Sequence, residues 1–329
     1  MKHYIDIIRW KNLLFLALIQ WLVQNSVVNP LFQKYDYQTA VNSPIFLLLM
    51  LSTVLITAGG YVINDYFDVK IDKINRPDKV VVGELIPLKS TMRYYQILTV
   101  AGTFIGITVA FISKSFSLAF IFILTPGLLW FYSASYKRQF LVGNLIISLL
   151  AALSIIIVGI LAVAQMKLDY GILLFETPIP KEIYGWTGGF AFFAFLLTLI
   201  REIIKDMEDI HGDRELECRT MPIKWGFEKT KLFLGALIVL TIGGLFHADH
   251  YFIDFENNIT ARYIIFGLCI PLLVLVYLIF KAKSPEEFHQ ASTLSKYIMF
   301  IGILFSLIFY YLLAVENNLS IFGLFSPIS

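Results

Sequence analysis

Two short stretches of the chain, 65–72 and 206–213, carry carboxylates in the same spacing, D-x-x-D-x-x-x-D. The six carboxylates are those of Asp65, Asp68, Asp72, Asp206, Asp209 and Asp213. Spacings of three and four residues predict that each set lies on one face of a helix. Clustered carboxylates repel one another unless cations lie between them, and Mg²⁺ binds through carboxylates and substrate phosphate oxygens. The pattern therefore predicts a magnesium site for a diphosphate substrate.

The composition places these carboxylates in a membrane protein. The 329 residues are 58% hydrophobic and 15% charged, whereas a soluble chain is about a quarter charged. The apolar runs are continuous, which indicates membrane-spanning helices. The net charge of +2, without a basic tract, argues against nucleic-acid binding. The histidines form no H-x-x-x-H pair, and Cys218 and Cys269 are expected to be ordinary buried cysteines rather than a disulfide or zinc site.

Nine segments are long and apolar enough to span a membrane, so we predict an all-α integral membrane protein in which residues 1–329 form one transmembrane domain. Their approximate limits are 12–30, 44–66, 91–113, 116–135, 141–165, 186–206, 230–247, 262–281 and 295–315. Polar Gln20, Gln24 and Asn25 interrupt the first segment and no A-x-A site follows, so we expect a retained span rather than a signal peptide. Gly59-Gly60 in the second predicts close helix packing or a bend.

The basic residues predict an orientation. With the N-terminus in the cytoplasm, all but five of the 26 Lys and Arg residues lie on the cytoplasmic side. The exceptions are Lys34, Lys114, Lys167, Lys181 and Arg262. The positive-inside rule then predicts a multi-pass protein of the cell membrane with its C-terminus outside. Both acidic sets follow helices that end in the cytoplasm and should face one cavity. Their separation by four helices suggests two four-helix repeats and an added ninth helix.

Each aspartate taken alone could simply mark the solvated end of a helix, where its charge ends the membrane span. Three of them at helical spacing, preceded by Asn64, followed by Arg76 and matched by a second set, favour a metal site instead. We expect two or three Mg²⁺ ions to bridge the carboxylates to a diphosphate, with Asn64 as a further metal ligand or a diphosphate contact. Stabilising the departing diphosphate would let an allylic C–O bond ionise, while an apolar wall protects the cation from water.

Basic and aromatic residues near the two sets are candidates for the remaining contacts. They are Arg76, Tyr132, Lys137, Arg138, Arg201 and Lys205. Lys137 and Arg138 could be positive-inside anchors, and Tyr132 part of an interfacial aromatic belt. Beside two acidic sets we favour phosphate or cation contacts. Arg201 lies inside an apolar run, where a basic residue is costly unless it pairs or lines a wet cavity.

Longer stretches around these residues resemble a known family. Asn64-Asp65-x-x-Asp68-x-x-x-Asp72 with Arg76-Pro77, and R-E-I-I-K-D-M-E-D-x-x-G-D over 201–213, are similar to the two signatures of the UbiA-type intramembrane prenyltransferases. The segments 132–144 and 219–226 also resemble that family. The resemblance implies nine helices around a central cavity under cytoplasmic cap loops. It also implies Mg²⁺-dependent transfer of a prenyl group from a prenyl diphosphate to a lipophilic acceptor.

The motifs look most like the ether-lipid branch of the family, which implies geranylgeranyl diphosphate as donor and the hydroxyl of geranylgeranylglyceryl phosphate as acceptor. After Arg76 the chain departs from the family's R-P-x-R-P-x-x-S-G, because Lys79, Val80 and Val82 replace Arg, Pro and Ser, and only Gly83 is kept. Lys79 preserves the charge but not the bidentate fork of arginine.

That departure leaves an aromatic quinone precursor as the alternative acceptor. A cation transporter is the alternative from another class, although transporter sites tend to lie near the bilayer midplane on broken helices. An enzyme that moves a phospho-alcohol head group would carry a single D-x-x-D-G-x-x-A-R motif, which this sequence lacks. No protein partner is implied.

Overall fold

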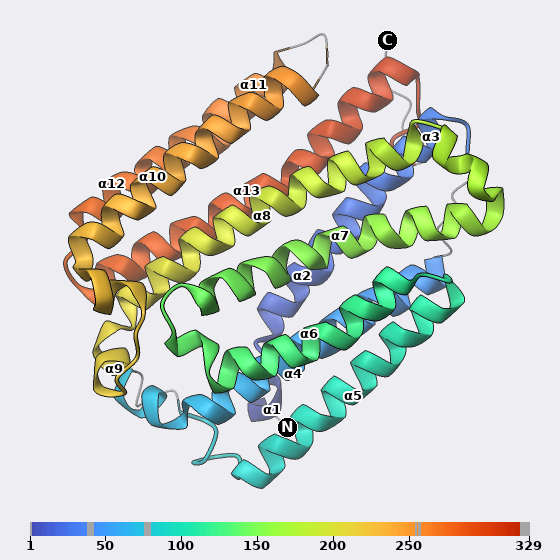
Figure 1. Cartoon of the computed structure of the whole chain (residues 1–329). Helices are drawn as coiled ribbons and strands as arrows, with labels where there is room; N and C mark the ends of the chain where they lie inside the picture. The colour runs from blue at the N-terminus through green and yellow to red at the C-terminus, as the bar shows by residue number, and fades with distance from the viewer. Residues whose placement is uncertain (1, 38–42, 76–79, 254, 256–257, 323–329) are drawn as a thin grey trace.

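The computed structural model describes residues 2–37, 43–75, 80–253, 255 and 258–322. Over this part of the chain, nine helical segments are long and apolar enough to cross a membrane, and they run side by side (Figure 1). Besides helices, the same residues contain an isolated β-bridge between Val82 and Ile86. The prediction of an all-α membrane protein with nine spans is therefore confirmed.

The part of the chain that the structure describes contains nine spans and four short helices. In chain order the spans are α2 (Trp10–Val23) with the π-helix η1 (Gln24–Val28) and α3 (Asn29–Lys34), α4 (Ser43–Asn75), α5 (Leu88–Ile112), α6 (Phe116–Ala134), α7 (Val142–Tyr170), α8 (Ile179–Glu208), α10 (Met221–Phe252), α11 (Ile259–Tyr263) with η5 (Ile264–Cys269) and α12 (Ile270–Lys281), and α13 (Pro285–Asn317). The connecting helices are α1 (Lys2–Ile7), η3 (Tyr136–Arg138), η4 (Ile172–Glu176) and α9 (Ile210–Glu215).

Several spans extend beyond the predicted limits. The second continues to Asn75, the sixth begins at Ile179, and the seventh begins at Met221 with an interruption at Gly226. A hydropathy pattern marks only the apolar part of a helix, whereas backbone hydrogen bonds continue into the polar turns on either side. The extension of α4 matters for function, because it puts the whole first acidic set on the last turns of one continuous helix.

Close packing of α4 against α5 and α6 depends on small residues. A Cβ atom on Gly59 would lie 2.3 Å from Thr99 Oγ1 of α5, and one on Gly60 would lie 3.0 Å from Leu129 of α6. Of the two roles predicted for this pair, close packing is the one observed, since α4 remains a single helix through both residues. The packing fixes the helix that carries the first acidic set.

Apolar side chains form two large clusters that share α8 and α13. One cluster includes Phe32, Leu161 and Phe309, and the other includes Ile200 and Leu272. The N-terminal half of α8, with Ile179 and Ile183, packs in the first cluster, and its C-terminal half packs in the second. Because α8 is buried in both, the start of the second acidic set at its end is held in place.

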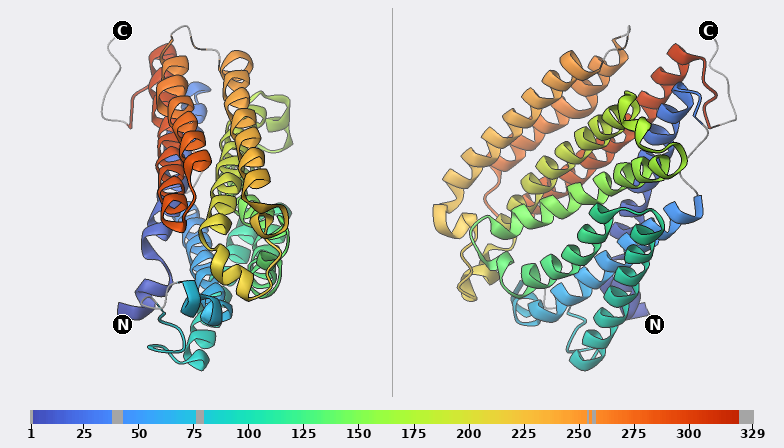
Figure 2. Two further views of the ribbon diagram at one scale, coloured as in Figure 1. Left: turned by 90° about the vertical axis from the view of Figure 1, so that its left-hand side faces the viewer. Right: turned by 45° about the vertical axis from the view of Figure 1, so that its right-hand side comes forward.

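The two acidic stretches meet at one end of the bundle. That end carries α1, η3, α9 and the ends of α4 and α8, whereas α13 ends at the opposite end (Figures 1 and 2). With an odd number of spans, the start of the first span and the end of the last span lie at opposite ends of the bundle, as observed. The predicted four-helix repeat stays a prediction.

Candidate active site

The first acidic set lies on one helix, as its spacing predicts. Asp65, Asp68 and Asp72 all belong to α4. Asp68 and Asp72 line a polar cavity at the end of the bundle. Asp65 is turned to the side of this cavity, where its Oδ1 accepts a hydrogen bond of 2.8 Å from Arg9 Nη2. The three carboxylates therefore face two neighbouring parts of the same region.

The prediction of a single helix is wrong for the second acidic set. Helix α8 ends at Glu208, Asp209 has φ −90° and ψ 10°, and Asp213 lies on the separate short helix α9. The spacing remains helix-like because the Asp213 amide still donates to the Asp209 carbonyl, at 3.2 Å. Packing of α9 against α4 accounts for the break, since a continued α8 would leave the bundle. The bend instead turns Asp213 back toward the first set.

The cavity collects most of the residues predicted from the sequence. Its walls contain Asn64, Asp68, Asp72, Tyr132, Lys137, Arg138, Lys205, Asp206, Asp209 and Asp213, together with Arg9, Ile71, Gly143, Asn144, Glu202 and Cys218. Asp65 and Arg201 are not on its walls, but each pairs with a residue that is. Arg76 lies outside the described residues, as does Lys79.

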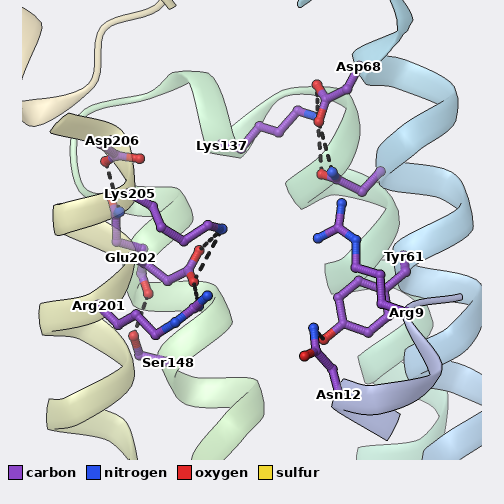
Figure 3. A network of polar contacts seen from close by, with 12 residues as sticks. Arg9, Asn12, Tyr61, Asp68, Lys137, Ser148, Arg201, Glu202, Lys205 and Asp206 are labelled. Atoms are coloured by element: carbon purple, nitrogen blue, oxygen red, sulfur yellow. Dashed lines mark hydrogen bonds and ion pairs between the residues drawn. The ribbon is translucent and has the colours of Figure 1, made fainter. Parts of the chain in front are cut away.

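Lys137 connects η3 to the first acidic set (Figure 3). Its Nζ donates to Asn64 Oδ1 at 3.1 Å and pairs with Asp68, and Asn64 Nδ2 donates to Asp68 Oδ2 at 2.8 Å. Burial lowers the pKa of Lys137, and the charge of Asp68 partly offsets that effect. The ammonium group thus neutralises Asp68 from the η3 side of the cavity.

The second acidic set is held by an amide and by burial. Asn144 Nδ2 donates to Asp206 Oδ2 at 2.9 Å. Burial, together with the nearby charges of Asp209 and Asp68, raises the pKa of Asp213 to about 7. This carboxyl is therefore buried among other carboxylates on the side of the cavity that faces the first acidic set.

The donor set fits a magnesium-bound diphosphate. Within the described ranges, no three His, Cys, Asp or Glu side chains are already arranged as a metal site. Carboxylates from α4, α8 and α9 nevertheless line one cavity, where they lie close enough to repel one another. Mg²⁺ typically takes one or two carboxylates and completes its shell with water and substrate phosphate. The cavity can supply the carboxylate ligands of Mg²⁺, and the phosphate oxygens of a bound substrate can supply further ligands.

Sequence reasoning missed Arg9, Asn144 and Glu202 as site residues. Arg9 projects from the turn between α1 and α2, with its guanidinium 4.9 Å from the centre of the Tyr61 ring. Glu202 is buried between two bases, accepting hydrogen bonds from Arg201 Nη1 at 2.7 Å and Lys205 Nζ at 3.2 Å. A carboxylate inside the apolar run of the sixth span was the signal for Glu202. Arg9 was indistinguishable from an ordinary positive-inside residue.

The two cysteines are free and buried, as expected. Cys218 does line the cavity, but burial and the charge of Asp213 raise the pKa of its thiol to about 11. A neutral thiol is a poor metal ligand and a poor nucleophile at neutral pH. Cys218 therefore forms part of the cavity wall and is not expected to react.

Comparison with known sequences decides the family. The sequence profile of the UbiA prenyltransferase family matches residues 35–304. The chain belongs to this family. A digeranylgeranylglyceryl phosphate synthase of Sulfolobus acidocaldarius is 31% identical over 90% of this chain and 93% of the relative. The synthase of Methanosphaera stadtmanae is 29% identical over 94% of this chain and 97% of the relative.

Solved structures share the UbiA fold. A structure of digeranylgeranylglyceryl phosphate synthase superposes with a TM-score of 0.64 at 23% identity, covering 94% of this chain and 98% of the other. A UbiA homologue from Archaeoglobus fulgidus bound to DMAPP and Mg²⁺ gives a TM-score of 0.56 at 14% identity, covering 93% and 99%. The protein is therefore a multi-pass membrane prenyltransferase of the UbiA family, and its polar cavity is the candidate active site.

Proposed function

We propose that this chain transfers a geranylgeranyl group from geranylgeranyl diphosphate to the hydroxyl of geranylgeranylglyceryl phosphate, with Mg²⁺ as cofactor. The observation that carries the proposal is the cavity in which both acidic sets meet Lys137 and Arg138. Relatives that are digeranylgeranylglyceryl phosphate synthases match this chain over nearly its whole length and support the acceptor. Metal ions would be held by Asp68, Asp72, Asp206, Asp209 and Asp213, with Asp65 and Asn64 beside them.

Different residues act on the diphosphate of the substrate and on its allyl group. Bound Mg²⁺ supplies positive charge to the diphosphate oxygens. Lys137 and Arg138 bind the remaining oxygens, as does Arg76, so that the diphosphate leaves with the electron pair of the C1–O bond. Tyr132 faces the allyl cation, whose C1 forms a new C–O bond with the acceptor oxygen. The hydroxyl proton passes to the released diphosphate.

We also propose that the cavity opens to the cytoplasm. By sequence, all but five of the basic residues belong to the segments on the same side of the spans as the acidic sets, and the positive-inside rule favours that side as cytoplasmic. A cytoplasmic mouth suits a prenyl diphosphate, whose charged end enters from water while its tail stays in the bilayer.

The proposal is tested with purified protein, geranylgeranyl diphosphate and Mg²⁺. Geranylgeranylglyceryl phosphate and an aromatic acid of the quinone-precursor type are offered separately, each with an EDTA control. Ether product from the glyceryl phosphate alone, abolished by EDTA, is the expected result. Product from the aromatic acid alone would move the enzyme to quinone synthesis, and metal-dependent cation uptake into proteoliposomes without any prenyl substrate would indicate a transporter.

Replacing one carboxylate of each set tests the metal-bridge geometry. We expect Asp68→Ala and Asp209→Ala each to lower transfer by at least about 100-fold, because each removes charge that must be matched in the transition state. Asp169→Ala is the matched control, since Asp169 is exposed at the end of α7, far from the cavity. Full activity in either cavity variant would contradict the assignment.

A further inference from the structure

The candidate active site has a second concentration of positive charge, deeper in the bundle than Lys137. Arg201 and Lys205 extend from α8, and Arg9 extends toward them from the opposite wall beside Tyr61 (Figure 3). Arg201 and Glu202 precede Asp206 by five and four residues, which corresponds to roughly 6–8 Å along a helix axis. An anion held here would lie below the acidic sets, not among them.

The hydrogen bonds of this group leave donors for a ligand. Glu202, whose side chain is 10% exposed, accepts from both Arg201 and Lys205. Arg201 Nε is buried and has no hydrogen-bond partner among the described residues. A buried donor without a partner costs free energy, on the order of 1–3 kcal/mol, unless something binds to it. The guanidinium of Arg201 therefore has unused hydrogen-bonding capacity beside Glu202.

The charges of the group do not cancel. Arg9, Arg201 and Lys205 all act electrostatically on Glu202, and Lys296 of α13 is close enough to interact with the three cations. The carboxylates paired with this group are Glu202 and Asp65. In the ion pairs of this group, Arg9 pairs with Asp65 while Arg201 and Lys205 share Glu202, so three cations are paired with two carboxylates. A phosphate monoester, with about −1.5 to −2 charges at pH 7, complements that excess.

The backbone at Arg9 supports a binding role. Arg9 has φ 53° and ψ 52°, a left-handed conformation that is uncommon outside Gly, Asn and Asp. Its amide donates to the Asp6 carbonyl at 3.0 Å, which closes the turn between α1 and α2. The turn places the guanidinium at the cavity wall against Asp65 and Tyr61, with the side chain 41% exposed. Such strained positions persist where the surrounding structure holds them, often at ligand sites.

We infer that Arg9, Arg201 and Lys205 form a subsite for the phosphate monoester of the acceptor, distinct from the diphosphate site at Lys137 and Arg138. The inference rests on the proposed function, because the phosphate monoester it places here belongs to the proposed acceptor. The subsite fixes the acceptor at its phosphate, which orients the neighbouring hydroxyl toward the diphosphate. It reassigns Arg201 and Lys205, which the sequence pattern alone associated with the diphosphate.

The test compares apparent KM values for the two substrates in Arg9→Gln and Lys205→Gln. We expect KM for geranylgeranylglyceryl phosphate to rise about tenfold or more in each, as loss of a charge-assisted hydrogen bond predicts. KM for geranylgeranyl diphosphate and the Mg²⁺ dependence should stay within about twofold. Arg9→Lys should recover part of the acceptor affinity. Lys11→Gln is the matched control, because Lys11 is exposed two residues away.

Two further arms identify the group that is recognised. For the wild type, the apparent KM for geranylgeranylglycerol, which lacks the phosphate, should be as high as the KM of the variants for the phosphorylated acceptor. For the variants, removing the phosphate from the acceptor should raise the KM no further. Glycerol 1-phosphate should compete with the acceptor in the wild type more strongly than inorganic phosphate does. Stronger competition by inorganic phosphate would overturn recognition of a head-group monoester.

The outcomes separate the inference from the proposed function. No wild-type product from geranylgeranylglyceryl phosphate would reject the proposed function. Wild-type product with unchanged acceptor KM in both Arg9→Gln and Lys205→Gln would reject the subsite alone. A rise in KM for geranylgeranyl diphosphate would return these cations to the diphosphate site. If Arg9→Gln fails to fold, Lys205→Gln and Arg9→Lys still decide the question.

Discussion

At the scale of single residues, the cavity is organised by groups that hold its carboxylates in place. Lys137 and Asn64 hold Asp68, and Asn144 holds Asp206. Lys137 and Asn64 together occupy both oxygens of Asp68, so a metal would have to share or displace them, whereas Asn144 binds one oxygen of Asp206. The aspartates are thus positioned before substrate binds.

Asn144 provides the clearest test of positioning. We expect Asn144→Leu to lower kcat/KM by roughly tenfold, since Asp206 loses the amide that orients it while keeping its charge. The half-saturating Mg²⁺ concentration should rise in parallel. Transfer measured against Mg²⁺ concentration checks both. Asn144→Gln, which keeps an amide, should lie between wild type and Asn144→Leu, and an unchanged Mg²⁺ dependence in Asn144→Leu would contradict the positioning role.

Residue type and spacing were sufficient to find the aspartates and Lys137, because carboxylates repeated at helical spacing are rare in an apolar chain. They were insufficient for Arg9 and Glu202. A basic residue ahead of the first span has the same appearance whether it sets topology or binds a ligand. Only the fold, which brings the turn before α2 across from α8, distinguishes the two roles.

At the scale of elements, the two acidic sets are built differently. The first lies on one helix, and the second is divided by a bend at Asp209 between α8 and α9. Hydropathy located the spans because burial in lipid demands long apolar runs. Hydropathy could not locate the bend, because the spacing of Asp206, Asp209 and Asp213 fits one continuous helix as well as two helices separated at Asp209. Packing of α9 on α4, a contact between distant segments, decides the outcome.

The position of η3 depends on its contact with the start of α7. A Cβ atom on Gly143 would lie 2.6 Å from Lys137 Cα. We expect Gly143→Ala to push η3 away from α7 and lower transfer by about tenfold or more, because Lys137 moves with its backbone. Gly127→Ala in α6 is the matched control, since its Cβ would meet nothing within 4 Å. Normal transfer in Gly143→Ala would show that η3 tolerates the shift.

At the scale of the whole molecule, a buried lysine ties the second apolar cluster together. Lys231 Nζ of α10 donates to the carbonyls of Ala282 at 2.8 Å and Phe280 at 3.2 Å, where α12 leads into α13. This contact lies away from the candidate active site, so its role is expected to be stability. It also shows that a buried cation in this protein need not bind a ligand when backbone oxygens satisfy it.

Lys231→Met should therefore separate stability from activity. We expect unfolding to become easier by about 1–3 kcal/mol, because two carbonyls lose their donor. Transfer at low temperature should be little changed. Thermal unfolding in detergent measures the difference, with Lys229→Met, an exposed neighbour, as the control. Equal stability of the two variants would indicate that water replaces the lysine.

Orientation in the membrane is a second property of the whole molecule. Lys89 and Lys181 are exposed at opposite ends of the bundle, at the starts of α5 and α8. With the cavity in the cytoplasm, a membrane-impermeant thiol reagent applied to intact cells should label Lys181→Cys and spare Lys89→Cys. The native thiols, which are buried, should stay unlabelled. The reverse pattern would place the cavity outside.

The ion pair between Lys137 and Asp68 has a consequence for biosynthesis. Asp206 is translated about 140 residues after Asp68, which at roughly 5–20 residues per second is a delay on the order of ten seconds. During that interval the nascent chain holds acidic groups at the edge of the bilayer without their opposite wall. Lys137 emerges midway and can neutralise Asp68 first. We expect this early ion pair to balance the charge of Asp68 before the helix that carries Asp206 is inserted.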